Sequence, residues 1–457
     1  MQIFIFRRDL RLEDNTTLNT LSKSSSPILP IFIFDPQQIN PNANPYFSNN
    51  CVQFMCECLQ DLSSSISDKN GKLYIFEGSP TTILTKLSKE LQIESVGCNR
   101  DYTPFSKERD NKITEWCHQN NAEFIQKEDI CINPIGSIRT AANKVYQKFT
   151  PFYNKASKVP VAPPVILRKY NFCNDKIALE ETELEKYYKE NKEILHKGGR
   201  TCALEQLGKI CDNEKYKETR DIPSIPTTEM SAYNKFGCIS IREFMKKLEE
   251  TVGLENGIAR QLYFRDFYYN IMEYNPRLLI TGEAYEEKFN KIKWDKPDKK
   301  MVDAFQNAQT GFPIIDAGIR QMLATGFMHN RVRMLVSSFW TKDLLYDWRI
   351  GEMFFANNLY DYDPSQNNAG WQTVAGTGAS ALDWFQVMNP WTQTQKFDPE
   401  CKYIKKWIPE LQKVKPSEIL NWDKQWKYNR KSGYPKPIVN HSKQREIMLK
   451  RYKQALK

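Results

Sequence analysis

Residues 1–131 alternate between short β-rich runs and helical patterns, and no other feature constrains the fold of this chain as strongly. The β-rich runs are QIFIF (2–6), ILPIFIF (28–34), KLYIF (72–76) and SVGCN (95–99). Between them, apolar residues recur at helical spacing over roughly 50–65, 80–91 and 106–120. Such alternation predicts right-handed crossovers and a parallel sheet. No G-x-G-x-x-G follows the first run, so we expect an open α/β domain without the standard dinucleotide fingerprint.

The rest of the chain follows a different pattern. Residues 132–195 lose both periodicities, and their proline-rich and acidic stretches predict a long connector with some helix. From 196 to 457, apolar residues recur every three or four positions almost throughout, which predicts a larger all-α domain. A chain of 457 residues is long enough for both domains to bury their own cores.

Composition limits the cellular compartments in which the protein is expected. No stretch approaches the roughly 20 apolar residues of a membrane helix, and the N-terminus lacks a secretory signal. Eleven cysteines without framework spacing indicate a reducing compartment, and four histidines give a metal site little to draw on. We expect a cytoplasmic or nuclear protein, monomeric, that binds neither a membrane nor a metal.

The net charge of +10 is concentrated near the C-terminus. Residues 396–457 hold 17 Lys and Arg against 6 Asp and Glu, with several Trp residues among them. A basic, Trp-containing region suits a polyanion such as nucleic acid. Solvated Lys-rich helices are also common, so the charge pattern alone leaves both interpretations open.

One arginine in the helical region needs a partner. Arg333 follows Val332 and precedes three apolar residues, and a half-buried guanidinium without a carboxylate is costly. Asp361 and Asp363 come soon after, in a predicted loop. Either carboxylate could pair with Arg333, and an ordinary structural ion pair would explain the pattern equally well.

Six motifs occur in one order over about 400 residues. They are FRRDLRLEDN, DYTPFSKERD, TTEMSAYNKFGCIS, TGFPIIDAGIRQ, MHNRVRM and the stretch from NNAGWQ to NPWTQTQKFDPE. Together they make the sequence similar to the photolyase/cryptochrome family. The resemblance implies an α/β antenna domain, a helical domain that holds FAD, and light-driven repair of UV-damaged DNA by the reduced flavin.

The resemblance also implies which residues hold the flavin. The matching positions are Tyr216, Thr227, Thr228, Met230, Ser231, Arg265, Arg333, Asp361, Asp363 and Asn367. The segment from Thr227 to Ser231 would bind the diphosphate, which agrees with hydroxyl-rich residues at a helix start. Arg333 and Asp361 would pair beside the isoalloxazine ring. Asn367 would face the reactive flavin nitrogen, where a neutral amide tolerates the reduced anionic flavin that repair needs.

Three tryptophans match an electron relay of the family. Trp371 would lie nearest the flavin, followed by Trp348 and then by Trp294 at the surface. Indole is oxidisable, and short hops between indoles are faster than one long transfer. With ten tryptophans in the chain, simple packing is the competing explanation for any one of them.

The lesion-facing positions agree with the family only in part. Photolyases flip the damaged dinucleotide into a pocket, and Asn330 and Met334 match the pattern for cyclobutane dimers. Phe264 and Thr373 stand where the family has two Trp walls, and Gln261 replaces a Glu. Base–aromatic stacking contributes about 1–3 kcal/mol per base, so we expect weaker lesion binding unless another residue compensates. Trp384 and Trp391 are candidates for that role.

Basic and polar positions complete the predicted DNA site. Those that match DNA contacts of the family are Arg220, Arg265, Arg331 and Gln393. Surface solubility is the alternative explanation for each residue, but together with the basic C-terminal region they are consistent with a phosphate-facing surface.

The sequence therefore predicts a carbon–carbon lyase that repairs cyclobutane pyrimidine dimers. A cryptochrome photoreceptor is one alternative, although Asn367 is typical of repair enzymes and no long segment follows the last family-like motif. A (6-4) photolyase is another, favoured by Gln261 and opposed by Asn330 and Met334. The family also implies a second, light-harvesting chromophore in or beside the α/β domain. Its identity stays open, because Phe105 and Ser106 replace the Asn–Glu pair of folate-binding members.

Overall fold

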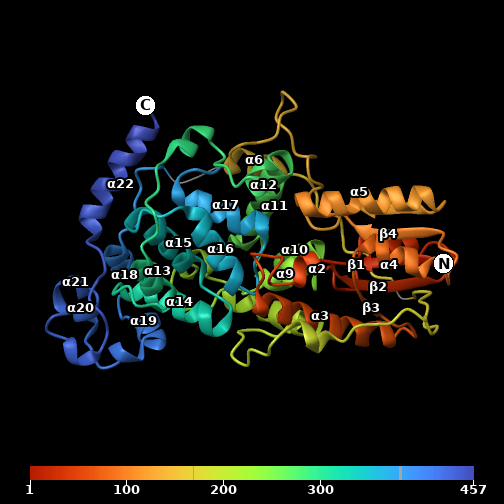
Figure 1. The fold of residues 1–457 in the computed structure, drawn as a ribbon, viewed down its shortest axis with the longest axis horizontal. Coiled ribbons are helices and arrows are strands. Elements are labelled where there is room, and N and C mark those ends of the chain that lie inside the picture. Colours follow the sequence, from red (N-terminus) through yellow and green to blue (C-terminus); the bar gives the residue numbers. More distant parts are fainter. Residues whose placement is uncertain (168, 380–382) are drawn as a thin grey trace.

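The structure is a computed structural model that describes residues 1–167, 169–379 and 383–457. An α/β part and a helical part lie at opposite ends of an elongated molecule (Figure 1). The N-terminus belongs to the α/β part and the C-terminus to the helical part. The predicted fold class is confirmed, whereas the predicted boundaries at 131 and 195 stay predictions.

Five parallel strands form the sheet. They are β1 (Gln2–Phe6), β2 (Ile28–Phe34), β3 (Tyr74–Glu77), β4 (Ser95–Asn99) and β5 (Glu123–Lys127). Their order is β3-β2-β1-β4-β5. The first four overlap the predicted β-rich runs. The sequence pattern missed β5 because EFIQK is largely polar and only partly buried at the sheet edge.

Helices cover both faces of this sheet. The connecting helices are α1 (Thr16–Leu21), α2 (Pro36–Ile39), α3 (Asn49–Ser67), α4 (Pro80–Leu87) and α5 (Pro104–Gln119). Side chains alternate along a strand, so Phe4 and Phe6 of β1 pack in the core that contains α3. Ile3 and Ile5 pack with α4 and α5 on the other face. Burial on both faces explains why the strands read as continuous apolar runs.

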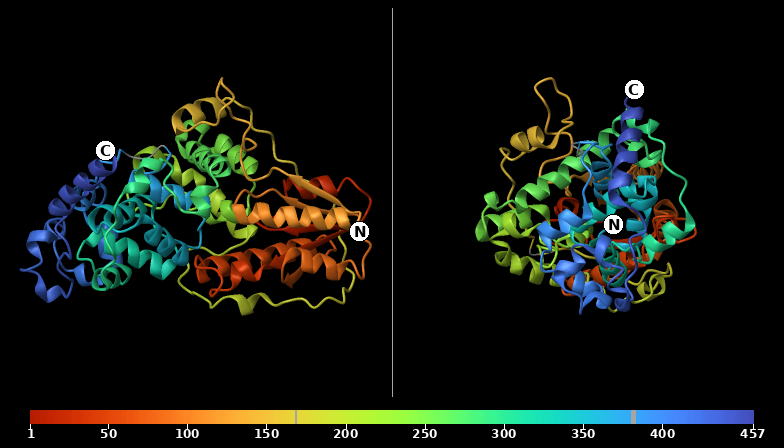
Figure 2. Two further views of the ribbon diagram at one scale, coloured as in Figure 1. Left: turned by 45° about the horizontal axis from the view of Figure 1, so that its top comes forward. Right: turned by 90° about the vertical axis from the view of Figure 1, so that its left-hand side faces the viewer.

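The connector wraps back over the α/β part. Its one α-helix among the described residues, α6 (Phe149–Ala156), packs against the helical part. Farther along, the side-chain amides of Asn49 and Gln53 on α3 donate to the carbonyls of Lys189 and Asn191, at 2.6 and 3.2 Å. The connector thus runs along the outer side of α3 (Figure 2, left).

The helical part contains many short helices and a few long ones. They are α7 (Arg200–Gly208), α8 (Tyr216–Thr219), α9 (Ser231–Phe236), α10 (Ile241–Thr251), α11 (Ile258–Tyr274), α12 (Arg277–Ile280), α13 (Lys299–Gln306), α14 (Pro313–Thr325), α15 (Asn330–Ser338), α16 (Trp348–Asn358), α17 (Pro364–Ala375), α18 (Pro390–Phe397), α19 (Lys402–Trp407), α20 (Pro416–Ile419), α21 (Trp422–Gln425) and α22 (His441–Ala455). A π-helical turn, Phe339–Asp343, follows α15. Helices α11, α15 and α16 all pack against α17, which makes α17 the centre of the candidate site.

The motif FRRDLRLEDN joins the two parts of the molecule. Arg11 Nη2 donates to Asp129 Oδ2 at 2.6 Å within the α/β part. Arg242 of α10 donates to Asp14 Oδ2 at 2.6 Å and to Asp129 Oδ1 at 2.9 Å. The two carboxylates are almost fully buried and Arg242 is largely buried, and buried ion pairs need complete hydrogen bonding. The motif therefore has a structural role at the interface between the α/β and helical parts.

Candidate flavin and lesion site

Arg333, on α15, forms an ion pair with Asp361. Arg333 Nη2 lies 2.9 Å from Asp361 Oδ2, and Arg333 Nε donates to the carbonyl of Met328 at 2.7 Å. Ser231 Oγ, at the start of α9, donates to the same Asp361 oxygen at 2.6 Å. This resolves the open alternative in favour of Asp361. The ion pair also links α9 to α15 and to the loop before α17.

Three buried polar atoms near this pair lack partners among the described residues. They are Asp361 Oδ1, His329 Nε2 and Tyr360 Oη. Burial lowers the pKa of His329 to about 4, and its Nδ1 accepts from the N–H of Arg331 at 3.2 Å. The neutral ring therefore carries its proton on Nε2. Buried donors and acceptors without partners are costly, so these atoms suit a polar aromatic ligand such as the flavin ring.

The predicted diphosphate turn precedes α9. Met230 is the N-cap residue of this helix and provides no side-chain cap, so first-turn N–H groups are left without a side-chain acceptor. The carbonyl of Thr228 accepts a hydrogen bond from Gln206 Nε2 of α7 at 3.1 Å, and this bond holds the turn against α7. Tyr216 begins α8, upstream of the turn. The geometry fits the predicted diphosphate contact of Thr227, Thr228, Met230 and Ser231, which stays a prediction.

The side chain of Asn367 is held in one orientation. Its Nδ2 donates to Glu352 Oε1 at 2.7 Å and to the carbonyl of Glu352 at 3.0 Å. Burial raises the pKa of Glu352 to about 7. Since both bonds use the amide N–H₂ group, Asn367 Oδ1 is left as the acceptor. An acceptor at this place suits a flavin that carries a proton on its reactive nitrogen.

Two predicted cofactor residues already have partners in the protein. Asp363 is the N-cap of α17, accepts from Ser365 N and Gln366 N at 3.0 and 3.1 Å, and also binds Tyr269 and Arg8. A carboxylate has about four acceptor positions, so a flavin contact would have to replace one of these donors.

Arg265 also has protein partners. Its Nη1 donates to the carbonyl of Ile130 at 2.9 Å, and its guanidinium lies over the ring of Tyr269. Its side chain is 13% exposed. A contact with a DNA phosphate or with the flavin would require Arg265 to leave these partners, so its predicted roles stay predictions without support from the geometry.

The three relay tryptophans belong to one buried cluster. Trp371 and Trp348 are almost fully buried, and Trp294 packs at the edge of the same cluster, where it is partly exposed. The ring of Trp294 also contacts Tyr452 edge-on, with centroids 6.3 Å apart. This gradient from buried to partly exposed agrees with the predicted order, which itself stays a prediction.

The lesion-facing end has an aromatic arrangement that the sequence did not reveal. Phe264 of α11 packs on Phe149 of the connector helix α6, with ring centroids 3.9 Å apart. Tyr268, one turn farther along α11, contacts Phe264 at 5.1 Å. The hydroxyls of Tyr268 and Thr373 are 2.8 Å apart. Tyr268 therefore stands beside the position where one Trp wall is missing.

The two tryptophans considered as replacements lie elsewhere. Trp391 stacks on Phe312 with centroids 4.8 Å apart. Trp384 stacks on Tyr452 with centroids 6.2 Å apart. Neither ring pairs with Phe264 in the ring contacts of the described residues, so their compensating role stays a prediction without support from the geometry.

The other predicted lesion and DNA residues lie on α11, α15 and α18 and just after α8. Asn330 is exposed at the start of α15, and Met334 follows one turn later. Gln261 precedes Phe264 by one turn on α11 and is half-buried. Arg331 pairs with Asp221 at 2.8 Å. The remaining two, Arg220 and Gln393, follow α8 and lie on α18 respectively.

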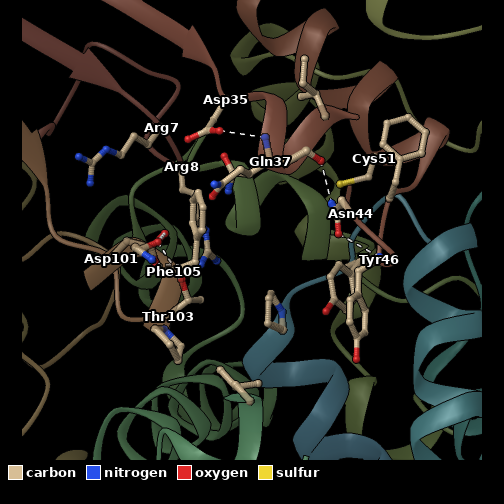
Figure 3. A pocket seen from close by; sticks show the side chains of 18 of the residues that line it. Arg7, Arg8, Asp35, Gln37, Asn44, Tyr46, Cys51, Asp101, Thr103 and Phe105 are labelled. Carbon is tan, nitrogen blue, oxygen red and sulfur yellow. Dashed lines mark hydrogen bonds and ion pairs between the residues drawn. The ribbon is translucent and has the colours of Figure 1, made fainter. Parts of the chain in front are cut away.

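A separate cavity of about 710 Å³ lies between the α/β and helical parts. It opens at the carboxyl ends of β1 and β2, the usual place for ligands in open α/β sheets. Figure 3 shows Arg7, Arg8 and Phe105 on one side and Tyr46 on the other. Both Nη atoms of Arg7 and Nη2 of Arg109 make no hydrogen bond with the described residues, although Arg7 pairs with Asp110. Sequence reasoning placed a chromophore in this region but named none of these arginines.

Two classes of feature are missing from the described residues. No helix there has the length and apolar character needed to cross a bilayer. Nor does that part of the chain bring three or more His, Cys, Asp or Glu side chains together in a way that could hold a metal ion.

The fold and the site define a two-domain flavoprotein. A family model described as DNA photolyase matches residues 2–165, and one described as the FAD binding domain of DNA photolyase matches residues 258–454. A deoxyribodipyrimidine photo-lyase from Halobacterium salinarum is 32% identical, over 100% of this chain and 99% of that protein. The chain therefore belongs to the DNA photolyase family, and FAD is its cofactor.

Solved structures agree with this assignment. A photolyase from Sulfolobus tokodaii, described with two FAD molecules that imply a novel light-harvesting cofactor, has a TM-score of 0.88 and 37% identity, and the match covers 99% of each chain. A class III photolyase from Agrobacterium tumefaciens has a TM-score of 0.91 and 29% identity, and covers 99% of this chain and 97% of its own.

Proposed function

We propose that this protein repairs cyclobutane pyrimidine dimers in DNA by light-driven electron transfer, as a deoxyribodipyrimidine photo-lyase. The observation that carries the proposal is the arrangement on α15. Arg333 pairs with Asp361 at the flavin side, and Asn330 and Met334, which are typical of dimer repair, lie on the same helix. One rigid element thus connects cofactor and lesion.

The side chains of the protein bind and orient the reactants. When bound, reduced FAD absorbs blue light and supplies the electron that opens the dimer. The Arg333–Asp361 pair orients the flavin ring, and Asn367 Oδ1 accepts a hydrogen bond from it. Asn330 and Gln261 donate hydrogen bonds to the pyrimidine carbonyls. Phe264 and Tyr268 provide the apolar surface against which the flipped dimer stacks.

The tryptophan cluster restores the reduced cofactor. Trp371 donates an electron when oxidised flavin absorbs light. Trp348 then reduces the oxidised Trp371, and Trp294, at the protein surface, reduces the oxidised Trp348. Trp371 Nε1 has no hydrogen-bond partner among the described residues, so the oxidised indole has no base to take its proton. That favours onward electron transfer over a trapped neutral radical.

UV-damaged DNA is the proposed partner, and it is bound by a monomer. Arg220, Arg331 and Gln393 contact backbone phosphates together with the basic region 396–457. Arg331 is paired with Asp221, so it must exchange a carboxylate for a phosphate on binding. We place the protein in the cytoplasm or nucleus, where DNA is accessible. Sedimentation at several concentrations tests the monomer.

The second chromophore is a flavin nucleotide in the cavity between the α/β and helical parts. The relative from Sulfolobus tokodaii is described with two FAD molecules. Arg7 and Arg109 line this cavity and both pair with Asp110, and a phosphate would compete with that carboxylate for their guanidinium N–H groups. Extraction of purified protein should give two flavins per chain, falling to one in an Arg7→Ala/Arg109→Ala variant. One flavin per wild-type chain would contradict this part of the proposal.

A lesion assay tests the proposed activity. The reduced protein is incubated with DNA that carries either defined cyclobutane dimers or defined (6-4) products, in blue light and in the dark. We expect light-dependent loss of the cyclobutane dimers alone. Loss of (6-4) products alone would support the alternative repair activity, and loss of neither lesion would leave the photoreceptor alternative.

A further inference from the structure

Two buried cysteines from distant parts of the chain meet at the junction of the α/β and helical parts. Cys58 lies on α3, and Cys238 lies between α9 and α10. Their sulfur atoms are 3.4 Å apart across a sequence separation of 180 residues. Both side chains are fully buried, and neither has a place in the proposed repair chemistry.

The segment that begins α7 covers this pair. The N–H of Gly199 donates to Cys58 Sγ at 3.1 Å. A Cβ on Gly198 would lie 2.2 Å from the carbonyl oxygen of Phe54, so only glycine lets the chain lie this close to α3. Arg200 Nη1 donates to the carbonyl of Cys238 at 3.0 Å. The two sulfurs are therefore held in contact by hydrogen bonds from a third segment.

We infer that Cys58 and Cys238 are a redox-active pair that forms a disulfide between α3 and the α9–α10 loop under oxidising conditions. Two S–H bonds break and one S–S bond forms, with two protons and two electrons passing to a small-molecule disulfide, which becomes two thiols. The sulfurs must move from 3.4 Å to about 2.0 Å. Burial raises the pKa of the Cys58 thiol, so the reaction is slow and depends on transient opening of the junction.

The disulfide would restrain the flavin side of the molecule. Cys238 is two residues beyond the end of α9, and α9 begins at Ser231, which binds Asp361. A cross-link that closes a loop of this length removes much conformational freedom from the unfolded chain. The oxidised protein should therefore melt at a higher temperature than the reduced protein, whether or not the protein repairs DNA.

Peptide mapping tests the pair directly. The flavin-bearing protein is treated with glutathione disulfide, its remaining thiols are alkylated in denaturant, and it is digested with trypsin. We expect the peptide FGCISIR (236–242) joined to the peptide of α3, and a higher melting temperature that dithiothreitol reverses. Free thiol at Cys238 after oxidation just below the melting temperature, continued long after exposed Cys211 is fully modified, would overturn the inference.

Matched variants identify the partner sulfur, because the α3 peptide also contains Cys51 and Cys56. Cys56 is as fully buried as Cys58 and lies on the same helix, but its sulfur faces the carbonyl of Leu184 at 3.7 Å. Cys56→Ala should keep both the cross-link and the temperature shift, whereas Cys58→Ala and Cys238→Ala should lose both. A cross-link to FGCISIR that survives in Cys58→Ala would contradict the assignment.

Discussion

The flavin-facing and lesion-facing regions share α15 and α17 but differ in how closely they follow the family. On the flavin side, Arg333, Asp361 and Asn367 match the family pattern, and each is fixed by hydrogen bonds within the protein. On the lesion side, the two expected Trp walls are replaced by Phe264 and Thr373. There, Tyr268 contacts Thr373 and the connector helix α6 packs on Phe264, and we propose that these side chains compensate for the missing rings.

The flavin-facing region follows the family more closely than the lesion-facing region because its polar groups are more deeply buried. Each buried polar group on the flavin side depends on another, so changing one side chain leaves another without a partner. The lesion side is half-exposed, and its aromatic surface can be assembled from neighbouring helices at small cost. Substitutions in the proposed lesion pocket are therefore expected to disturb the flavin side little.

The largest effect is expected from Trp371→Phe on the flavin side. Phenylalanine is much harder to oxidise than indole, so light-driven reduction of the oxidised flavin should be lost. Repair by chemically reduced protein should continue, because it does not need the relay. The flavin absorption spectrum during illumination is the readout, with Trp391→Phe as control. Unchanged photoreduction in Trp371→Phe would remove the relay from the account.

Asp361→Ala should be the most destabilising change. It leaves the partly buried Arg333 without its carboxylate, and breaking a buried pair costs about 3–5 kcal/mol. Loss of bound flavin should accompany the loss of stability in denaturant unfolding. Asp295→Ala removes the exposed partner of Arg451 and should cost about 0–1 kcal/mol. Similar losses in the two variants would mean that the flavin side is no more constrained than the surface.

Glu352→Gln should change the pH dependence of stability. The pKa of Glu352 rises from 4.5 to about 7 on folding, so the folded state binds a proton that the unfolded state releases. Wild-type stability should therefore fall by up to about 3 kcal/mol as pH rises from 4.5 through 7. Glutamine keeps an acceptor for Asn367 and removes this fall. The prediction is contradicted if the unfolding free energies of wild type and Glu352→Gln change with pH in parallel. Glu400→Gln, at an exposed position, is the control.

On the lesion side, Phe264→Ala should weaken binding of dimer-containing DNA selectively. Loss of a stacking ring costs about 1–3 kcal/mol, or roughly ten- to a hundredfold in affinity. Binding of undamaged duplex should change little, since that depends on phosphate contacts. Dark titrations of both duplexes measure the two effects. An equal loss for both duplexes would place Phe264 outside the lesion pocket.

The smallest effect is expected from Tyr268→Phe, which deletes the 2.8 Å hydrogen bond to Thr373. A single neutral hydrogen bond contributes about 0.5–1.5 kcal/mol, so dimer affinity should fall a few-fold while flavin content stays constant. Thr373→Val should have a similar effect, and the double variant should add little to either. Additive losses would show that the two hydroxyls act independently.

Sequence patterns were sufficient for the fold class and for most of the sheet. Apolar runs located β1 to β4, because strands buried on both faces leave a strong signal. The edge strand β5 gave no such signal. Pairing of Arg333 could be predicted, but its choice of Asp361 over Asp363 could not, since both carboxylates follow in one loop and Arg8 takes the other.

Contacts between segments far apart in the chain could not be predicted from the sequence. Phe149 and Phe264 are far apart in the chain, and only the packing of α6 on α11 brings their rings together. Arg7 and Arg109 line one cavity because β1 ends and α5 begins at the same, carboxyl edge of the parallel sheet. Neither contact leaves a periodicity or spacing that a single sequence displays.

The central claim is that the altered pocket still takes a cyclobutane dimer. The most direct measurement is the dark affinity of the reduced protein for three matched duplexes, which carry one cyclobutane dimer, one (6-4) product or no lesion. We predict tightest binding of the dimer duplex, with that preference reduced in Phe264→Ala. Equal binding of all three duplexes, or a preference for the (6-4) product, would contradict the account.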